Sequence, residues 1–391
     1  MAKQHFETLA IRTQVPRSAQ REHAVPLYLT SSFVFDSAEH GAALFGGEQE
    51  GNLYSRFSNP NTDEFIEKLR LLEGAEAGIA TASGMAAVFV ALAALLQAGD
   101  HVVASSAIFG NSLHIITDIL PRYGIAYTLA QVDDPNSWQA AVRPDTRLLF
   151  VETPANPTLR IADLAFLAEL CSARDIILVV DNCFATPYLQ QPILFGADLV
   201  VHSATKYLDG QGRVLGGAVV GRAQYVEQCY NFLRRTGASL SPFNAWVLSK
   251  SLETLSLRMD RHCDNAEKLA AYLQQHPEIE TVVYPHLPDN PQYELARRQM
   301  SRGGGLVGCE LRGGSARGAR FLNALQLHSL TANLGDTRSI ATHPASTTHA
   351  RISPEERQAA GITPGFIRFS VGLEHIDDII ADIEQAIEKS K

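Results

Sequence analysis

The feature that most constrains the fold is a pair of short, almost wholly aliphatic runs in the middle of the chain. The sequence IILVVDN spans residues 176–182, and FGADLVV spans residues 195–201. Strands without polar alternation are expected where helices cover both faces of a sheet, as they do in parallel sheets. The two runs therefore predict an interior sheet of an α/β protein rather than a sheet with one face in water.

Helical and strand-like patterns alternate on both sides of these runs. Helices are predicted near 62–74, 83–99, 111–121 and 163–175, and strands near 101–105, 125–132, 146–153, 176–182, 198–206 and 216–221. Such alternation predicts a mostly parallel sheet built from successive strand–helix units.

The pattern changes near residue 245. Residues 241–277 predict either one very long helix or two in succession, short strands follow within 279–285, 304–313 and 365–374, and a helix over 376–390 ends the chain. Residues 1–52 carry few helix signals and are predicted to form an extended arm that contacts a neighbouring subunit. The predicted organisation is therefore an arm (1–52), a large α/β domain (53–245) and a smaller α+β domain (246–391).

Composition narrows the class of partner. The chain has 391 residues, 46% of them hydrophobic and 19% charged, with a net charge of -9. This is a globular composition, and its acidic balance argues against nucleic acid or an anionic membrane as partner. The five cysteines form no CxxC pair, and no apolar segment resembles a secretory signal or a membrane span. We therefore expect a cytoplasmic protein.

Chemically reactive side chains follow two neighbouring predicted strands. Lys206 lies just past the aliphatic run at 195–201, among small hydroxyl residues. Asp181 ends the preceding aliphatic run. Ligands of parallel sheets bind beyond the carboxyl ends of the strands, and a lysine held there is a candidate for amine chemistry. A carboxylate at the end of an apolar strand needs a partner. A helix cap or a salt bridge accounts for Asp181 equally well.

A second group of residues precedes the helix predicted from about residue 85. Ser83, Gly84 and Met85 would place a hydroxyl and backbone N–H groups at a helix N-terminus, which suits a phosphate. An ordinary helix cap accounts for Ser83 equally well. Asn156 follows another strand, where the plain interpretation is a turn asparagine.

The lysine, the carboxylate and the phosphate cradle have one common explanation. Pyridoxal 5'-phosphate (PLP) requires a lysine for covalent attachment, an acid beside its ring nitrogen and a phosphate site. A nucleotide site is a poorer explanation, because no GxGxxG follows the first strand and no GxxxxGK[ST] occurs in the chain.

The sequence resembles the Cys/Met-metabolism family of PLP-dependent enzymes over nearly its whole length. The resemblance lies in YSRFSNPN (54–61), TASGMAA (81–87), ETPANP (152–157), VVDNCF (179–184), HSATKYLDGQG (202–212) and RFSVGLE (368–374). It implies the type I fold of aspartate-aminotransferase-like enzymes, with a mostly parallel sheet in the large domain and a smaller C-terminal α+β domain.

The resemblance also implies roles for residues around PLP. Lys206 would hold the cofactor covalently, and Asp181 would pair with its ring nitrogen. The residues implied to surround the phosphate or the lysine are Ser83, Gly84, Met85, Ser203 and Thr205. Tyr54 and Arg56 would reach the phosphate of a neighbouring subunit, which requires at least a dimer. Homotetramers built as a dimer of dimers are common in the family, and we expect one here.

Further implied roles concern the substrate. Asn156 would contact the ring or the substrate carboxylate, Arg368 would bind the substrate α-carboxylate, and Ser339 would assist through its backbone. Phe109 stands where relatives usually carry tyrosine, so it can stack on the ring but cannot transfer a proton. Cys183 stands where threonine is frequent, and inert packing is the plain interpretation of a buried thiol.

The implied reaction follows from two stretches, 235–259 and 331–362, which are most similar to the sulfhydrylase branch of the family. It is a γ-replacement in methionine biosynthesis, in which O-succinyl-L-homoserine and sulfide give L-homocysteine and succinate. O-acetylhomoserine sulfhydrylase and cystathionine γ-synthase are the alternatives, with cystathionine and methionine lyases ranked below them.

Alternatives from other classes are a PLP-binding regulator without activity and a lysine-based aldolase without cofactor. His343 and His349 are separated by six positions with a proline between, which fits no helical zinc pair, so no metal site is predicted.

Overall fold

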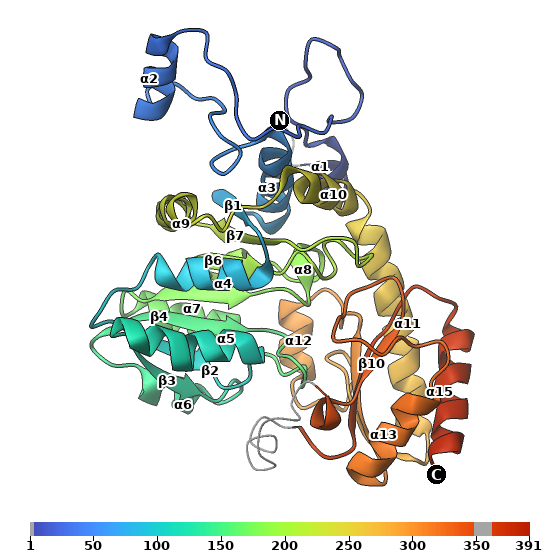
Figure 1. Cartoon of the computed structure of the whole chain (residues 1–391). Helices are drawn as coiled ribbons and strands as arrows, with labels where there is room; N and C mark the ends of the chain where they lie inside the picture. The colour runs from blue at the N-terminus through green and yellow to red at the C-terminus, as the bar shows by residue number, and fades with distance from the viewer. Residues whose placement is uncertain (1–3, 348–361) are drawn as a thin grey trace.

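The computed structural model of the chain describes residues 4–347 and 362–391. A seven-stranded sheet organises the first half (Figure 1). Its strands are β1 (Ala77–Thr81), β2 (His101–Ser105), β3 (Ala126–Ala130), β4 (Thr146–Glu152), β5 (Ile177–Asp181), β6 (Leu199–His202) and β7 (Gly217–Gly221). They lie in the order β1-β7-β6-β5-β4-β2-β3. Every pair of adjacent strands from β3 through β2, β4 and β5 to β6 is parallel. Strand β7 is antiparallel to both of its neighbours, β1 and β6.

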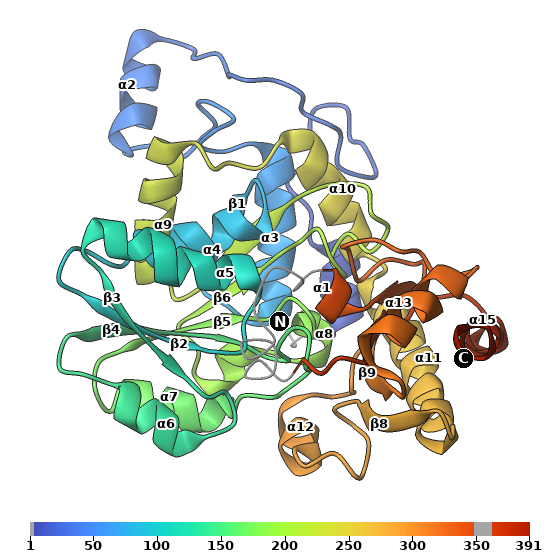
Figure 2. The same ribbon diagram turned by 60° about the horizontal axis from the view of Figure 1, so that its bottom comes forward.

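Helices cover both faces of this sheet. They are α3 (Pro60–Glu73), α4 (Gly84–Ala93), α5 (Gly110–His114), α6 (Pro135–Ala141), α7 (Leu164–Ser172), α8 (Thr186–Leu189) and α9 (Ala223–Thr236). Figure 2 shows α4 and α5 on one side of the sheet and α6 and α7 on the other. The mostly parallel α/β sheet that the sequence predicts is therefore confirmed.

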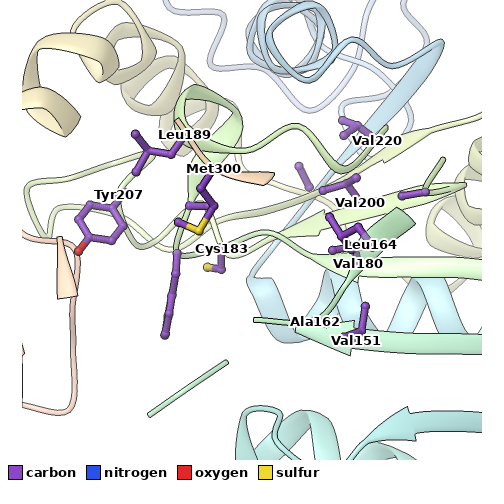
Figure 3. Close-up of a cluster of buried hydrophobic side chains, with 14 of the residues drawn as sticks. Val151, Ala162, Leu164, Val180, Cys183, Leu189, Val200, Tyr207, Val220 and Met300 are labelled. Carbon is purple, nitrogen blue, oxygen red and sulfur yellow. The ribbon is translucent and has the colours of Figure 1, made fainter. Parts of the chain in front are cut away.

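The aliphatic run in β5 has its physical explanation in these two layers. Ile177 and Val179 pack into the cluster beneath α4 and α5, whereas Leu178 and Val180 pack into the cluster on the opposite face. On that second face Val180 is in register with Val151 of β4 on one side and with Val200 of β6 on the other. Figure 3 shows this row of side chains crossing the sheet. A strand buried on both faces cannot carry polar alternation.

The second half of the chain contains a four-stranded antiparallel sheet in the order β10-β11-β9-β8. Its elements are α10 (Pro242–Leu252), α11 (Leu255–Gln275), β8 (Ile279–Val283), α12 (Tyr293–Gln299), β9 (Leu306–Leu311), α13 (Gly314–Ala324), β10 (Ile340–Thr342), β11 (Phe366–Ser370) and α15 (Ile376–Ser390). Residues 241–277, for which the sequence predicts either one long helix or two, form the two helices α10 and α11. The predicted boundaries at residues 52 and 245 stay predictions.

The N-terminal arm contains more helix than the sequence predicts. It forms α1 (Phe6–Arg12) and α2 (Ala38–Gly46), and both views show α2 projecting from the rest of the chain (Figures 1 and 2). Capping explains α2, because the Ser37 hydroxyl accepts from the His40 N–H and Gly47 ends the helix at φ 73°. Within this arm Val34 is 97% exposed. Leu29 and Phe45, each 68% exposed, are further large apolar side chains of the arm that face outward.

Two further observations complete the fold. None of the helices in the described ranges is long and apolar enough to cross a membrane. The turn that follows Lys206 is fastened to α11 by the buried guanidinium of Arg258, which donates to the carbonyl oxygens of Tyr207 (2.6 Å) and Ser251 (3.0 Å). A third bond reaches the carbonyl oxygen of Leu208 (3.4 Å). Arg258 thus connects the lysine turn to the second half of the chain.

Replacing Arg258 with methionine keeps much of its apolar length and removes these donors. We expect the free energy of unfolding to fall by about 2–4 kcal/mol, because hydrogen bonds from charged groups contribute about 1.5–3 kcal/mol each and the carbonyls stay buried. Urea unfolding measures the change. The matched control Arg261→Met lies on the exposed side of the same helix, where Arg261 donates to one carbonyl oxygen, that of Glu374 (3.2 Å). The control should change stability by less than about 1 kcal/mol, and equal losses in the two variants would contradict the role of Arg258.

Candidate active site

The site lies where the parallel strands β4, β5 and β6 end. Glu152 and Asp181 are the last residues of β4 and β5 and stand opposite each other in register. Lys206 follows the end of β6 in a turn in which its backbone N–H donates to the Ser203 carbonyl oxygen (3.2 Å). The structure therefore brings Asp181 and Lys206 to one edge of the sheet, where ligands of such folds bind.

Lys206 carries a partly buried amine with a specific partner. Its Nζ donates to Oδ1 of Asn333 (2.8 Å), a residue from the second half of the chain. Burial lowers the pKa of Lys206, and the positive charge of Arg368 lowers it further against an opposing effect of Cys183. An amine whose pKa is lowered holds its proton less tightly, and this favours its use as a nucleophile and a base.

Asp181 is a half-buried carboxylate that forms no ion pair with a cationic side chain of the described residues. One oxygen, Oδ1, accepts from the Cys183 N–H (3.0 Å), and Asp181 forms no ion pair with any residue in the described part of the chain. Burial raises the pKa of Asp181 to about 6, against smaller lowering effects of the Cys183 N–H and of His202. Burying a lone carboxylate is costly, so the group fits a site that receives a cation, such as a protonated ring nitrogen.

The N-terminus of α4 has the donors that a phosphate site requires. The Ser83 hydroxyl accepts from the Ala86 N–H (3.1 Å), which leaves the N–H groups of Gly84 and Met85 outside the helical bonding. A Cβ on Gly84 would lie 2.4 Å from the Cβ of Ser203, so only glycine allows the helix to approach the lysine turn. These donors and the Ser203 hydroxyl fit a phosphate. The Thr205 hydroxyl bonds the N–H (3.2 Å) and the carbonyl oxygen (3.3 Å) of Gly216.

Arg368 lies on β11 and points its guanidinium toward the same edge. Its NH1 donates to Oδ1 of Asn156 (2.7 Å), and its NH2 donates to the carbonyl oxygen of Asn333 (3.4 Å). Its Nε is buried without a hydrogen-bond partner. Burial lowers the pKa of Arg368 to about 10. A buried guanidinium with a donor to spare fits the carboxylate of an amino-acid substrate.

Ser339 is hydrogen-bonded within the second half of the chain. Its N–H and its hydroxyl donate to the carboxylate of Glu374 (2.7 and 2.9 Å), and its carbonyl oxygen accepts from the Ser329 N–H (2.9 Å). The substrate contact that the resemblance implies for Ser339 stays a prediction. Asn333, which the sequence did not indicate, contacts both Lys206 and Arg368.

Tyr54 and Arg56 have other partners in the same chain. The Arg56 guanidinium lies over the ring of Phe57, 4.8 Å from its centre, and donates to the carbonyl oxygen of Arg234. The Tyr54 side chain is 43% exposed. Neither residue bonds to the lysine turn or to the N-terminus of α4 within the described ranges. Their contact with the phosphate of a neighbouring subunit stays a prediction.

The remaining candidates have clear positions. Phe109 is 41% exposed, and its N–H donates to Oε2 of Glu152 (2.6 Å). The Cys183 thiol donates to the Ser203 carbonyl oxygen (3.4 Å), and burial raises its pKa, so the thiolate is disfavoured. The ring nitrogens of His343 are engaged by Ser346 Oγ (2.7 Å) and the Pro364 carbonyl oxygen (2.8 Å). His349 lies outside the described residues.

Comparison with known proteins finds relatives that match this chain over nearly its full length. The family described as Cys/Met metabolism PLP-dependent enzyme matches residues 7–388. The O-succinylhomoserine sulfhydrylase of Pseudomonas aeruginosa is 47% identical over 382 residues, covering 98% of this chain and 95% of that protein. The L-methionine gamma-lyase of Porphyromonas gingivalis is 42% identical over 386 residues, covering 98% and 97%.

A solved structure is similar over the same length. It is a crystal structure from Campylobacter jejuni of a protein described as an O-acetylhomoserine (thiol)-lyase, with N'-pyridoxyl-lysine-5'-monophosphate. It matches with a TM-score of 0.94 and 37% sequence identity, covering 98% of this chain and 99% of that one.

The pKa of Asp181 predicts how PLP affinity depends on pH. Asp181 is ionised above about pH 6 and protonated below it, so its attraction for a cationic ring nitrogen is present at high pH and lost as the pH falls through about 6. We expect Asp181→Asn to bind PLP at least about tenfold more weakly than wild type at pH 8, with the gap closing toward pH 5.

Fluorescence titration of the cofactor-free proteins with PLP measures both affinities. The ratio of the two dissociation constants at each pH removes the titration of PLP itself. A ratio that stays constant from pH 5 to pH 8 would show that Asp181 does not pair with the ring nitrogen.

Proposed function

We propose, because this chain belongs to the Cys/Met metabolism family of PLP-dependent enzymes, that it replaces the γ-substituent of an acylated homoserine with sulfide. The predicted family and cofactor are confirmed by the match over residues 7–388 and by the cofactor in the C. jejuni structure. The type I fold is confirmed by the same structural similarity.

The specific reaction we propose converts O-succinyl-L-homoserine and hydrogen sulfide to L-homocysteine and succinate. The Cγ–O bond breaks, a Cγ–S bond forms, and neither carbon nor sulfur changes oxidation state. The near full-length similarity to the P. aeruginosa sulfhydrylase supports this choice. The observation that supports an α-amino acid as substrate is the buried guanidinium of Arg368, whose Nε has no hydrogen-bond partner among the described residues.

PLP, when bound, supplies an electron-accepting ring that stabilises negative charge on the substrate carbons next to the amine. Lys206 Nζ takes the proton from Cα of the substrate and then a proton from Cβ, and it returns both later. Its lowered pKa leaves more of the amine unprotonated than in an exposed lysine, and so available as a base. Since Phe109 has no hydroxyl, we assign all of this proton transfer to Lys206.

Two residues from the second half of the chain position these groups. Arg368 holds the substrate α-carboxylate and so fixes the direction of the Cα–H bond relative to Lys206. Asn333 holds the Lys206 amine through its side-chain oxygen. Asp181 stabilises the protonated ring nitrogen, as its burial without a cationic partner indicates.

We further propose that Tyr54 and Arg56 act at the phosphate of a neighbouring subunit, within a homotetramer built as a dimer of dimers. The lack of a bond from either residue to the lysine turn within the described ranges, and the exposed apolar arm around Val34, support this assignment. The five cysteines are free and buried, which fits the reducing environment of the cytoplasm, where we place the enzyme.

The alternatives within the family differ in acyl group or in nucleophile. O-acetyl-L-homoserine would make the enzyme an acetyl-specific sulfhydrylase, and L-cysteine in place of sulfide would make it a cystathionine γ-synthase. The similarity to the P. gingivalis enzyme supports a lyase as the next candidate, in which the γ-group leaves without replacement.

Steady-state kinetics of the PLP-loaded enzyme separate these candidates. We expect the highest kcat/KM with O-succinyl-L-homoserine and sulfide, at least about tenfold above any pairing with the acetyl ester or cysteine. Chromatographic analysis should show homocysteine and succinate in equal amounts. Cystathionine as the main product with cysteine would establish the synthase instead, and rapid release of methanethiol from L-methionine alone would establish the lyase.

The role of Arg56 in a neighbouring subunit predicts complementation between two inactive variants. Arg56→Met and Lys206→Ala homo-oligomers should each have less than about 1% of wild-type activity. After the subunits are mixed and exchanged, a dimer with one chain of each kind has one site with both native residues. Statistical mixing should therefore restore about a quarter of wild-type activity. Mass spectrometry shows whether mixed oligomers have formed. If they have formed and activity does not recover, Arg56 does not act at the site of a neighbouring subunit.

A further inference from the structure

We propose that Glu152 is a positioning residue that holds the Phe109 loop and the Asn156–Arg368 pair in one fixed arrangement. This inference deepens the proposed function and rests on it only where Arg368 is taken to bind the substrate carboxylate. Neither the motif interpretation nor the roles implied by the family resemblance included Glu152.

Glu152 joins two loops that are separate in the sequence. Its side chain is buried, with the residue 3% exposed, at the end of β4. Oε2 accepts from the Phe109 N–H (2.6 Å), and Oε1 accepts from the Asn156 N–H (2.9 Å). One carboxylate therefore fixes the residue expected to stack on the PLP ring and the residue that bonds Arg368.

The hydrogen bonds continue beyond Asn156 to the catalytic amine. Asn156 Oδ1 accepts from Arg368 NH1 (2.7 Å), and the Asn333 carbonyl oxygen accepts from Arg368 NH2 (3.4 Å). The side-chain oxygen of Asn333 in turn accepts from Lys206 Nζ (2.8 Å). Glu152 is thus connected through Asn156 to the group that would bind the substrate carboxylate and, one residue further, to Lys206.

The position of Glu152 is costly and therefore needs a function. Its neighbour in register on β5 is Asp181, so two carboxyl groups stand side by side at the end of the sheet. Burial and the charge of Asp181 raise the pKa of Glu152, whereas the Phe109 N–H, the Asn156 N–H and Arg368 lower it. A neutral residue would avoid this repulsion. Only a carboxyl group, however, offers two acceptor oxygens to the two N–H groups.

Glutamine at this position is the sharpest substitution. It keeps the shape of Glu152 but has one acceptor oxygen, so its amide would face one of the two N–H groups. If Glu152 positions Arg368 through Asn156, the substitution weakens binding of any α-amino acid through its carboxylate. A purely structural role would lower stability and leave carboxylate binding unchanged.

The experiment uses L-norvaline, an amino acid with no leaving group on Cγ, and the PLP-loaded enzyme. Its dissociation constant is measured from the change in the visible absorption of bound PLP. We expect Glu152→Gln to raise this constant roughly tenfold or more, while the KM for sulfide changes less than about twofold. Norvaline undergoes no γ-replacement, so its dissociation constant tests the proposal whether or not the sulfhydrylase assignment holds.

Glu64→Gln is the matched control. Glu64 is also a fully buried carboxylate that accepts from a backbone N–H, that of Val15 (3.3 Å), but its side-chain partners are Lys68 of α3 and Ser249 of α10, and it forms no bond to the Lys206 edge within the described ranges. The control should lower the melting temperature and leave the norvaline constant within about twofold of wild type. Equal weakening in the two variants would overturn the proposal.

A double-mutant cycle tests the connection even where Glu152→Gln is poorly stable. Asn156→Ala removes the next link, so adding Glu152→Gln to it should raise the norvaline constant by less than about twofold more. Fully multiplicative effects of the two substitutions would show that Glu152 does not act through Asn156, and would overturn the proposal.

Discussion

The parallel register of β4, β5 and β6 is the constraint on which the rest of the structure depends. Because these strands run in the same direction, their carboxyl ends meet at one edge, where Glu152 stands beside Asp181 and Lys206 follows the next strand. Side chains alternate between the faces of a strand, so a slip of one residue would turn Asp181 to the opposite face. The dense aliphatic packing on both faces prevents such a slip, as the row through Val151, Val180 and Val200 illustrates (Figure 3).

The second half of the chain completes the site rather than merely flanking it. Arg368 on β11 and Asn333 in the segment between α13 and β10 reach the edge that the large sheet provides. Gly335, at φ 73°, allows that loop to approach closely, since a Cβ there would lie 2.8 Å from the Tyr207 N–H nitrogen. Arg258 of α11 fastens the turn that follows Lys206, because its guanidinium donates to the Tyr207 carbonyl oxygen. The positions of the Arg368 guanidinium and of the Lys206 amine are therefore set by contacts between the two halves, which explains why the amine is held in place by a residue distant in sequence.

The sequence predicted what depends on local pattern. The aliphatic runs indicated the parallel sheet, and the positions of Asp181 and Lys206 after two such runs placed both at its edge. The sequence did not predict residues whose role depends on which loops meet. Asn333 and Glu152 carry no pattern of their own, although Glu152 lies inside the recognised ETPANP motif. The role of Ser339 rests on the resemblance alone and stays a prediction, and the structure adds that its N–H and hydroxyl donate to Glu374. The capping signals of α2, Ser37 and Gly47, are present in the sequence, but they are too short-range to distinguish a helix from a turn within an otherwise extended arm.

The account's central claim is that this edge holds PLP on Lys206, with Asp181 at the ring nitrogen. A crystal structure of the PLP-loaded enzyme tests it most directly. We predict continuous density from Lys206 Nζ to the cofactor, a carboxylate oxygen of Asp181 within about 3 Å of the ring nitrogen, and the phosphate at the N-terminus of α4 beside Ser203. Density for PLP attached to another lysine, or a ring nitrogen turned away from Asp181, would contradict the account.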